Sequence, residues 1–271
     1  MLRNASAQAH LQAAILPHFC ERGQGIPQGA LHFLRSDFFP HFCERGQGMS
    51  DEKRTTDYAA ATVILVHGLW MPAAVFILHS HWLQRRGYRV RRFGYPSMRG
   101  TLAQNAQRLQ RFVAATGAAD IHLVGHSLGG LVILEMLAQM PDPRLRRAVL
   151  LGTPCVDSHC ARRLRALGMS ALLGRSLGEW LARATNATAA PRSAVEIGVL
   201  AGTRSVGLGR VIPGLPRPND GVVAVAETRL PGLADFIALP VAHAEMLASR
   251  RCVAQSAAFL ETGHFLHDEQ A

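Results

Sequence analysis

The chain has 271 residues, of which 48% are hydrophobic and 18% charged, a composition typical of one globular domain with a sizeable core. No stretch approaches 18 uninterrupted apolar residues, which argues against a transmembrane helix. The net charge of +10 comes almost entirely from arginine, because Lys53 is the single lysine. No basic motif with interleaved aromatic residues accompanies this charge, so we expect no nucleic-acid partner.

Arginines cluster in two stretches, at residues 85–92 and at residues 162–165. Charge runs of this kind usually form solvated surface, and this is the simplest interpretation of both stretches. The same clusters would also attract anionic substrates or lipid headgroups by long-range electrostatics. A transient contact with a membrane surface therefore stays open at this stage.

The five cysteines predict reduced thiols and not a disulfide framework. Their number is odd, and the N-terminus carries a broken apolar stretch unlike a signal peptide, so we expect a cytoplasmic protein. Cys155, His159 and Cys160 lie close together in sequence, but no second ligand pair follows at a usual metal spacing. We expect neither a metal ion nor another cofactor.

A nine-residue segment near the N-terminus occurs twice without change, at residues 17–25 and at residues 40–48. Two short copies are too few for a solenoid, which needs about three or more stacked units. Residues 49–53 then resemble an ordinary polar start. We therefore expect residues 1–48 to be a disordered or non-native extension, derived from repetitive DNA upstream of Met49. A genuine extension that binds a partner is the alternative.

Residues 49–271 predict one α/β domain. Apolar and β-branched runs predict strands at residues 62–66, 88–93, 121–124, 148–151, 196–202 and 236–240. Helices are predicted after the first strand, at residues 101–115, after residue 127 and at residues 249–261. Such alternation implies a mostly parallel sheet with helices on both faces. Ligands then bind at the carboxyl ends of the strands.

Residues 155–195 interrupt this alternation with an arginine- and leucine-rich segment. From residue 163 to residue 185, its leucines and Trp180 recur at roughly helical intervals. One interpretation is a small helical cap that covers the site and lines it with apolar side chains. The other is a further packing helix, and the sequence does not separate the two.

The segment Gly125-His126-Ser127-Leu128-Gly129 follows a buried apolar run and precedes a helical pattern. It has the G-x-S-x-G pattern of a nucleophile elbow. A serine on such a tight turn has unusual backbone angles, and its flanking glycines let strand and helix approach each other. The turn exposes the Ser127 hydroxyl and aims the first amides of the helix at the position of an oxyanion.

A serine hydroxyl needs a base, and the base needs a carboxylate that fixes its tautomer. In sheets of this kind the carboxylate follows the serine along the chain and the histidine comes last, each on a loop at a strand end. Asp220 and His243 satisfy this order after Ser127, so we expect these three residues to form a catalytic triad. His67 and His126 occupy motif positions in which the ring supports loops.

Other acidic residues and histidines suit these roles less well. They follow a strand too soon, open a strand or lie in the polar tail: Asp157, Glu196, Asp235, His264 and His267. For the oxyanion hole we expect two backbone amides. The Leu128 amide comes directly after the serine, and the loop after the first strand supplies the Leu69 amide, with Trp70 as the second choice.

Four segments together resemble the signature blocks of the α/β-hydrolase superfamily, most closely its small bacterial esterase- and lipase-like members. They are Val66–Trp70, Val124–Gly130, Asn219–Val223 and Ala242-His243, and the resemblance spans about residues 62–265. It implies acyl transfer through a serine-bound ester, followed by hydrolysis. The first block reads His-Gly-Leu-Trp and not the glycine-rich HGGG of some lipases, which argues against bulky tertiary esters.

The sequence thus predicts a serine hydrolase that cleaves a small-molecule carboxylic ester or thioester with an apolar acyl group. An acyltransferase that uses an acceptor other than water shares all these motifs and stays open. A third hypothesis is a non-catalytic hydrolase-fold protein that binds a partner through its arginine-rich insertion. The presence of all three triad residues argues against it, because a binding module has no need for them.

Overall fold

The computed structural model describes residues 61–140, 142–183, 194–207 and 212–267. The predicted extension at residues 1–48 lies outside these ranges, as does part of the predicted cap. Six strands form one parallel sheet in the order β2-β1-β3-β4-β5-β6. They are β1 Thr62–Val66, β2 Arg89–Phe93, β3 Ile121–His126, β4 Leu145–Leu151, β5 Glu196–Gly202 and β6 Asp235–Leu239. The predicted fold class is confirmed.

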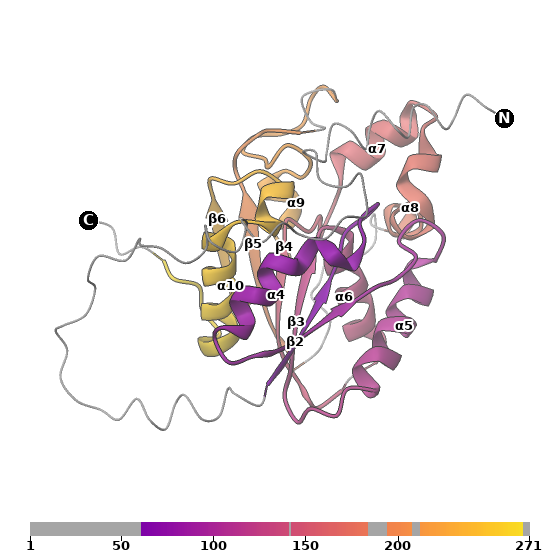
Figure 1. The fold of residues 1–271 in the computed structure, drawn as a ribbon. Coiled ribbons are helices and arrows are strands. Elements are labelled where there is room, and N and C mark those ends of the chain that lie inside the picture. The colour runs from indigo at the N-terminus through magenta and orange to yellow at the C-terminus, as the bar shows by residue number, and fades with distance from the viewer. Residues whose placement is uncertain (1–60, 141, 184–193, 208–211, 268–271) are drawn as a thin grey trace, which may run out of the picture. The chain divides into compact units, whose positions relative to one another are not determined.

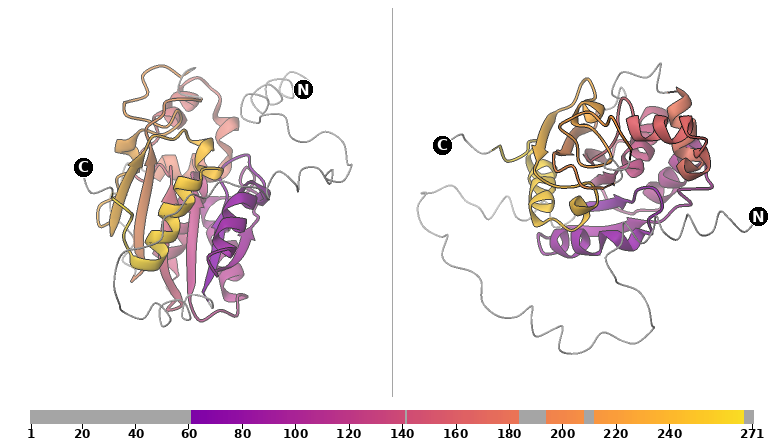
Figure 2. Two further views of the ribbon diagram at one scale, coloured as in Figure 1. Left: turned by 60° about the vertical axis from the view of Figure 1, so that its left-hand side comes forward. Right: turned by 90° about the horizontal axis from the view of Figure 1, so that it is seen from above.

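Helices cover both faces of this sheet (Figure 1). α4 and α10 pack on one face and α5 and α6 on the other, as the further views also show (Figure 2). The four are α4 Ile77–Gln84, α5 Leu102–Ala114, α6 Leu128–Gln139 and α10 Arg250–Thr262. Shorter turns are η1 Ala73–Phe76, α9 Val225–Thr228 and η5 Ala244–Leu247. Within the described residues, no helix has both the length and the hydropathy that crossing a membrane requires.

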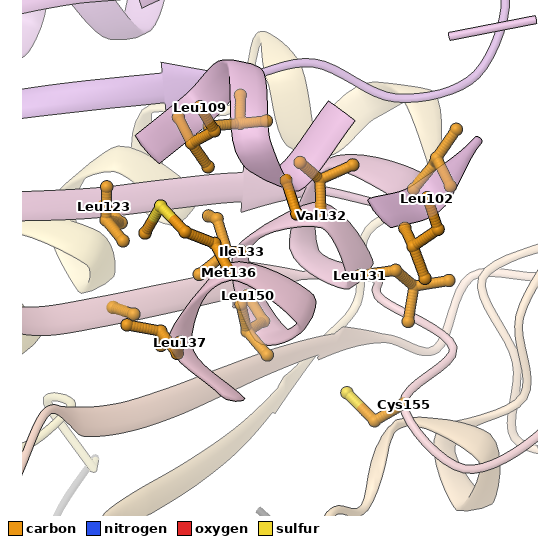
Figure 3. Close-up of a cluster of buried hydrophobic side chains, with 14 of the residues drawn as sticks. Leu102, Leu109, Leu123, Leu131, Val132, Ile133, Met136, Leu137, Leu150 and Cys155 are labelled. Carbon is orange, nitrogen blue, oxygen red and sulfur yellow. The ribbon is translucent and has the colours of Figure 1, made fainter. Parts of the chain in front are cut away.

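Each strand contributes to two cores, because successive side chains of a strand point to opposite faces. Ile64 and Val66 of β1 face α5 and α6, whereas Val63 and Leu65 face α4 and α10. The first core surrounds α6 (Figure 3) and includes Leu102, Leu109, Leu123, Leu131, Val132, Ile133, Met136, Leu137 and Leu150. Since almost the whole first half of α6 is buried, the residue at its start is held firmly in place.

The start of α5 is set by a capping box. The Thr101 hydroxyl accepts the Gln104 amide at 3.1 Å, and the Gln104 side chain accepts the Thr101 amide at 3.1 Å. These two bonds satisfy amides that the helix itself leaves unpaired. The predicted helix at residues 101–115 is confirmed, with Thr101 as its cap.

β4 begins three residues earlier than the predicted strand at residues 148–151. Leu145 already pairs with β3, but the register shifts between Ile121 and Leu123. The next residues of β4, Arg146 and Arg147, form ion pairs at the end of the sheet. Two arginines in succession interrupt the apolar pattern, so the sequence predicts too late a start.

The insertion folds as α7 His159–Ala166, η2 Ser170–Leu173 and α8 Gly174–Arg183 within the described residues. Asn105 of α5 donates from Nδ2 to the Ser176 hydroxyl at 2.9 Å. The Arg175 amide donates to the Met98 carbonyl oxygen at 3.0 Å, on the loop after β2. α8 therefore packs against α5, a contact that both interpretations of the insertion allow. A covering role over the site stays a prediction.

Candidate active site

Ser127 occupies the turn between β3 and α6, with φ +53° and ψ −121°. Residues with side chains rarely adopt a positive φ. A Cβ at Gly129 would lie 2.1 Å from the Val66 carbonyl oxygen, and a Cβ at Gly125 would lie 2.7 Å from the Gly130 amide nitrogen. Glycine is required at both positions because any side chain would push α6 away from the sheet.

Asp220 and His243 form a buried hydrogen-bonded pair, with exposed fractions of 1% and 8%. His243 Nδ1 donates to Asp220 Oδ2 at 2.7 Å. This bond places a proton on Nδ1, so in the neutral form of the ring Nε2 is the acceptor. Asp220 Oδ1 accepts the amides of Val222 at 2.9 Å and Val223 at 2.7 Å. These bonds fix the carboxylate and, through it, the orientation of the ring.

The bonded pair of Asp220 and His243 lies beside the turn that carries Ser127. A Cβ at Gly152, directly after β4, would be 3.0 Å from both Asp220 Oδ2 and His243 Nδ1. His126 Nε2 lies 3.0 Å from the His243 carbonyl oxygen, and the centroids of the two rings are 4.6 Å apart. Within the described chain, no hydrogen bond joins the Ser127 hydroxyl to Asp220 or His243. The structure thus pairs Asp220 with His243 and packs His243 against His126, the residue before Ser127.

The loop after β1 also reaches the elbow. A Cβ at Gly68 would lie 3.2 Å from the Ser127 Cβ. Trp70 has φ +60°, and it shares a positive φ with Ser127 alone among the described residues other than glycine. Backbone strain of this kind concentrates at functional sites. In the described part of the chain, the amides of Leu69 and Leu128 make no hydrogen bond, so the fold leaves both available to an acceptor.

His67 supports the loop to which it belongs. Its Nδ1 donates to the Gly68 carbonyl oxygen at 2.9 Å, and its Nε2 accepts the Tyr95 amide at 3.4 Å. The Tyr95 ring stacks on His67 with centroids 4.3 Å apart, and its hydroxyl donates to the His67 carbonyl oxygen at 2.7 Å. Burial lowers the pKa of His67, which keeps the ring neutral, as these bonds require. The contacts agree with the predicted supporting role.

His126 links the turn of the predicted nucleophile to the loop of the predicted base. It is fully buried, and burial followed by the nearby His243 holds its pKa well below the usual value. The neutral ring donates from Nε2 to the His243 carbonyl oxygen, so its Nδ1 carries no proton. This contact likewise agrees with the predicted supporting role.

Two glutamates that the sequence analysis did not identify anchor the loops of Asp220 and His243. Glu245 accepts the Ala242 amide at 2.9 Å, directly before the predicted base. Glu227 accepts the Ala224 amide at 2.8 Å and also the amide of His159, the first residue of α7. Burial raises the pKa of Glu227. In both cases a glutamate reaches an amide three residues earlier, so this spacing was the available signal.

The sequence matches the model of the Alpha/beta hydrolase family over residues 63–271. No curated protein matches the chain. The mature lipase BlEst2 of Bacillus licheniformis has a similar structure, with 18% identity and a TM-score of 0.57 over 75% of this chain and 92% of the lipase. A carboxyl esterase from a metagenome is 20% identical, with a TM-score of 0.53 over 77% of this chain and 70% of the esterase.

The esterase RhEst1 of a Rhodococcus species is 18% identical, with a TM-score of 0.50 over 76% of this chain and 92% of that one. At such identities, likeness to a solved structure establishes the fold alone. The family match is broader, because it extends from β1 through the turn at Ser127 and the loops of Asp220 and His243 to the end of the chain. The chain belongs to the alpha/beta hydrolase family.

Proposed function

We propose that the protein hydrolyses carboxylic esters or thioesters with an apolar acyl group. In this proposal Ser127 is the nucleophile, His243 the general base and Asp220 the carboxylate that orients the base. The observation that carries it is the buried 2.7 Å hydrogen bond between Asp220 and His243, packed against the positive-φ elbow. A protein that only binds a partner has no use for a buried acid–base pair beside a strained serine.

The proposed reaction begins when His243 Nε2 takes the proton of the Ser127 hydroxyl as the oxygen attacks the ester carbonyl carbon. The carbonyl oxygen becomes an oxyanion, which the amides of Leu69 and Leu128 stabilise. His243 then protonates the leaving alcohol or thiol, and a serine-bound ester remains. Water that is deprotonated by His243 cleaves this ester, releases the carboxylic acid and restores the serine.

The surroundings of the elbow support an apolar acyl group. Leu128 is buried directly after the proposed nucleophile, and Leu69, Trp70 and Met71 follow β1 as half-buried side chains. The similar structures are those of a lipase and two esterases, which supports esters as the substrate class. These identities are low, so the hydrogen-bonded pair of Asp220 and His243 is the stronger support for the proposal.

A fluorophosphonate probe tests the proposal, because it labels only serines whose oxygen is activated. Intact mass is measured on wild type, on Ser127→Ala and on Ser170→Ala, a control that removes an exposed serine of η2. We expect one adduct on wild type and on the control, and none on Ser127→Ala. A folded wild type without an adduct would refute the proposal.

Product analysis then separates hydrolysis from acyl transfer. Purified enzyme receives p-nitrophenyl acetate, butyrate or octanoate, with and without an added alcohol as acceptor. Hydrolysis predicts the free acid as the main product in both cases, with faster turnover of the longer acyl groups. A new ester as the main product would assign the same serine to an acyltransferase.

A further inference from the structure

The turn between α7 and α8 exposes apolar side chains. Residues 166–171, here named the insertion tip, are all exposed to solvent. Leu167 is 62% exposed, the highest value of any large apolar side chain in the part of the chain that the structure describes, and Met169 is 38% exposed. Between them, Gly168 has φ +73°, and a Cβ there would meet no atom within 4 Å. The turn therefore projects both side chains into solvent.

Arginines without acidic partners flank the insertion tip. Arg163 and Arg165 on α7 and Arg175 at the start of α8 are exposed, and none of them takes part in an ion pair among the described residues. The acidic residues of the same segment pair elsewhere: Asp157 with Arg162, and Glu179 with Arg183. The apolar insertion tip is therefore flanked by unneutralised positive charge.

The insertion tip lies at the end of the sheet that carries the elbow. The Arg175 amide donates to the Met98 carbonyl oxygen at 3.0 Å, and Met98 belongs to the loop after β2. β2 and β3 are both parallel neighbours of β1, so the loop after β2 and the turn with Ser127 lie at the same end of the sheet. This end, where the strands have their carboxyl termini, is here named the carboxyl edge, and the opposite end the amino edge. α7 and α8 appear near this edge in Figure 1.

We propose that the insertion tip docks on an anionic lipid surface. Leu167 and Met169 would enter the boundary between headgroups and acyl chains, while Arg163, Arg165 and Arg175 would contact the phosphates. This combination of apolar and cationic side chains is the one that a membrane interface attracts. A nucleic acid would engage the arginines but would provide no apolar layer for the leucine and the methionine.

Docking in this orientation turns the carboxyl edge, with its elbow, toward the lipid. The inference goes beyond the proposed function and does not depend on it, because binding to vesicles is measured without turnover. If both hold, the substrates are esters that partition into or lie at a lipid surface. Their apolar acyl groups would then reach the elbow from the side on which the protein is bound.

Co-sedimentation with vesicles tests the inference. Vesicles of phosphatidylcholine alone are compared with vesicles of equimolar phosphatidylcholine and phosphatidylglycerol. We expect the wild type to bind the anionic vesicles preferentially, and to bind less at high salt, because salt screens exposed charges. The triple variant Arg163→Gln, Arg165→Gln, Arg175→Gln should bind about 100-fold more weakly. The double variant Leu167→Ser, Met169→Ser should also lose most of its binding.

Control variants carry three arginine changes and one leucine change at the opposite end of the sheet. Arg85, Arg86 and Arg89 are exposed and precede or begin β2, so their change to glutamine removes equal charge at the amino edge. Leu266 is 59% exposed, and the amide of the preceding Phe265 donates to Asp235, the first residue of β6. Leu266 therefore lies at the amino edge, and Leu266→Ser removes an exposed leucine there. Both controls should retain wild-type binding.

Three results would overturn the inference: no wild-type binding to anionic vesicles, equal weakening by the control variants, or unchanged binding after Leu167 and Met169 are replaced. Strong binding to an RNA duplex that the Leu167→Ser, Met169→Ser variant keeps in full would reassign the arginines to nucleic acid. Turnover of water-soluble p-nitrophenyl butyrate is followed in parallel. It should stay at the wild-type level in the tip variants, so a failure of docking is distinguished from a failure of the proposed chemistry.

Discussion

Asp220 receives three hydrogen bonds through its two carboxylate oxygens, and they serve different ends. Oδ1 takes two amides of its own loop, which fixes the side chain in place. Oδ2 accepts a hydrogen bond from His243 Nδ1, and this bond fixes the tautomer of the proposed base. A substitution that changes only the hydrogen bond to His243 therefore tests the effect of the tautomer while the side chain at position 220 stays in place.

Asp220→Asn is such a substitution. Its carboxamide oxygen still accepts the two loop amides, but its NH2 group faces His243 Nδ1 and drives the ring proton to Nε2, the atom that accepts the serine proton in the proposed reaction. We expect kcat to fall by about 10⁴, the size of the effect known for this change in a serine protease, with little change in thermal stability. The measurement is kcat with p-nitrophenyl butyrate, alongside a melting curve.

Asp235→Asn is the matched control. Asp235 also contacts a histidine, His267 at 2.9 Å, but at the start of β6, away from the elbow. This variant should retain wild-type kcat. If Asp220→Asn were as active as the control, Asp220 would have no role in orienting the base.

At the scale of elements, the elbow depends on how closely α6 approaches β1. The buried first half of α6 leaves no room to shift, and the Val66 carbonyl oxygen lies where a side chain at Gly129 would begin. Gly129→Ala should therefore lower the free energy of unfolding by more than ~2 kcal/mol. Gly178→Ala is the control, because a Cβ there meets no atom within 4 Å.

In the control helix α8, alanine is the better helix former, so Gly178→Ala should be neutral or stabilise by up to ~1 kcal/mol. Urea unfolding of both variants provides the comparison. Equal stabilities of the two variants would mean that α6 adjusts to a side chain at position 129 and that close packing does not hold the elbow.

The elements near the site could be predicted because their signals are local. The glycines around Ser127 and the cap at Thr101 each act within five residues, so one short segment of sequence contains the whole signal. The order of serine, acid and histidine selected Asp220 and His243 by a chain rule, although the hydrogen bond between them joins residues 23 positions apart.

What could not be predicted depends on contacts between distant segments. Nothing near Asn105 indicates that its side chain bonds to Ser176, 71 residues later, so the sequence does not show which helix α8 packs against. The contact between His126 and the carbonyl oxygen of His243 spans 117 residues and likewise has no local signal. Both depend on the side-by-side arrangement of elements that only the assembled sheet defines.

Across the whole molecule, buried histidines join remote parts of the chain in neutral form. His79 of α4 donates from Nδ1 to the Leu247 carbonyl oxygen at 3.0 Å, and burial lowers its pKa to about 4. Burial, with a smaller effect from Arg147, lowers the pKa of His122 in β3 to about 4 as well. The pKa of His126 is also held well below the usual value. Global stability therefore depends on pH.

The sign follows from proton binding. A histidine in the unfolded chain binds a proton near pH 6.5, whereas His79 and His122 in the folded chain do so only near pH 4. Between these values the unfolded chain binds more protons, so the free energy of unfolding decreases as the pH falls. The stabilisation is fully present above about pH 6.5 and is lost progressively toward pH 4.

His79→Gln tests one of these groups, because glutamine is of similar size and carries an amide donor but does not titrate. Between pH 7 and pH 5 the variant should lose about 2 kcal/mol less stability than the wild type, measured by urea unfolding at both pH values. His81→Gln, on the exposed side of the same helix, controls for a glutamine in α4. If His79→Gln lost as much stability as wild type over this interval, the acid sensitivity would have to come from other groups, with His122 and His126 the next to be replaced.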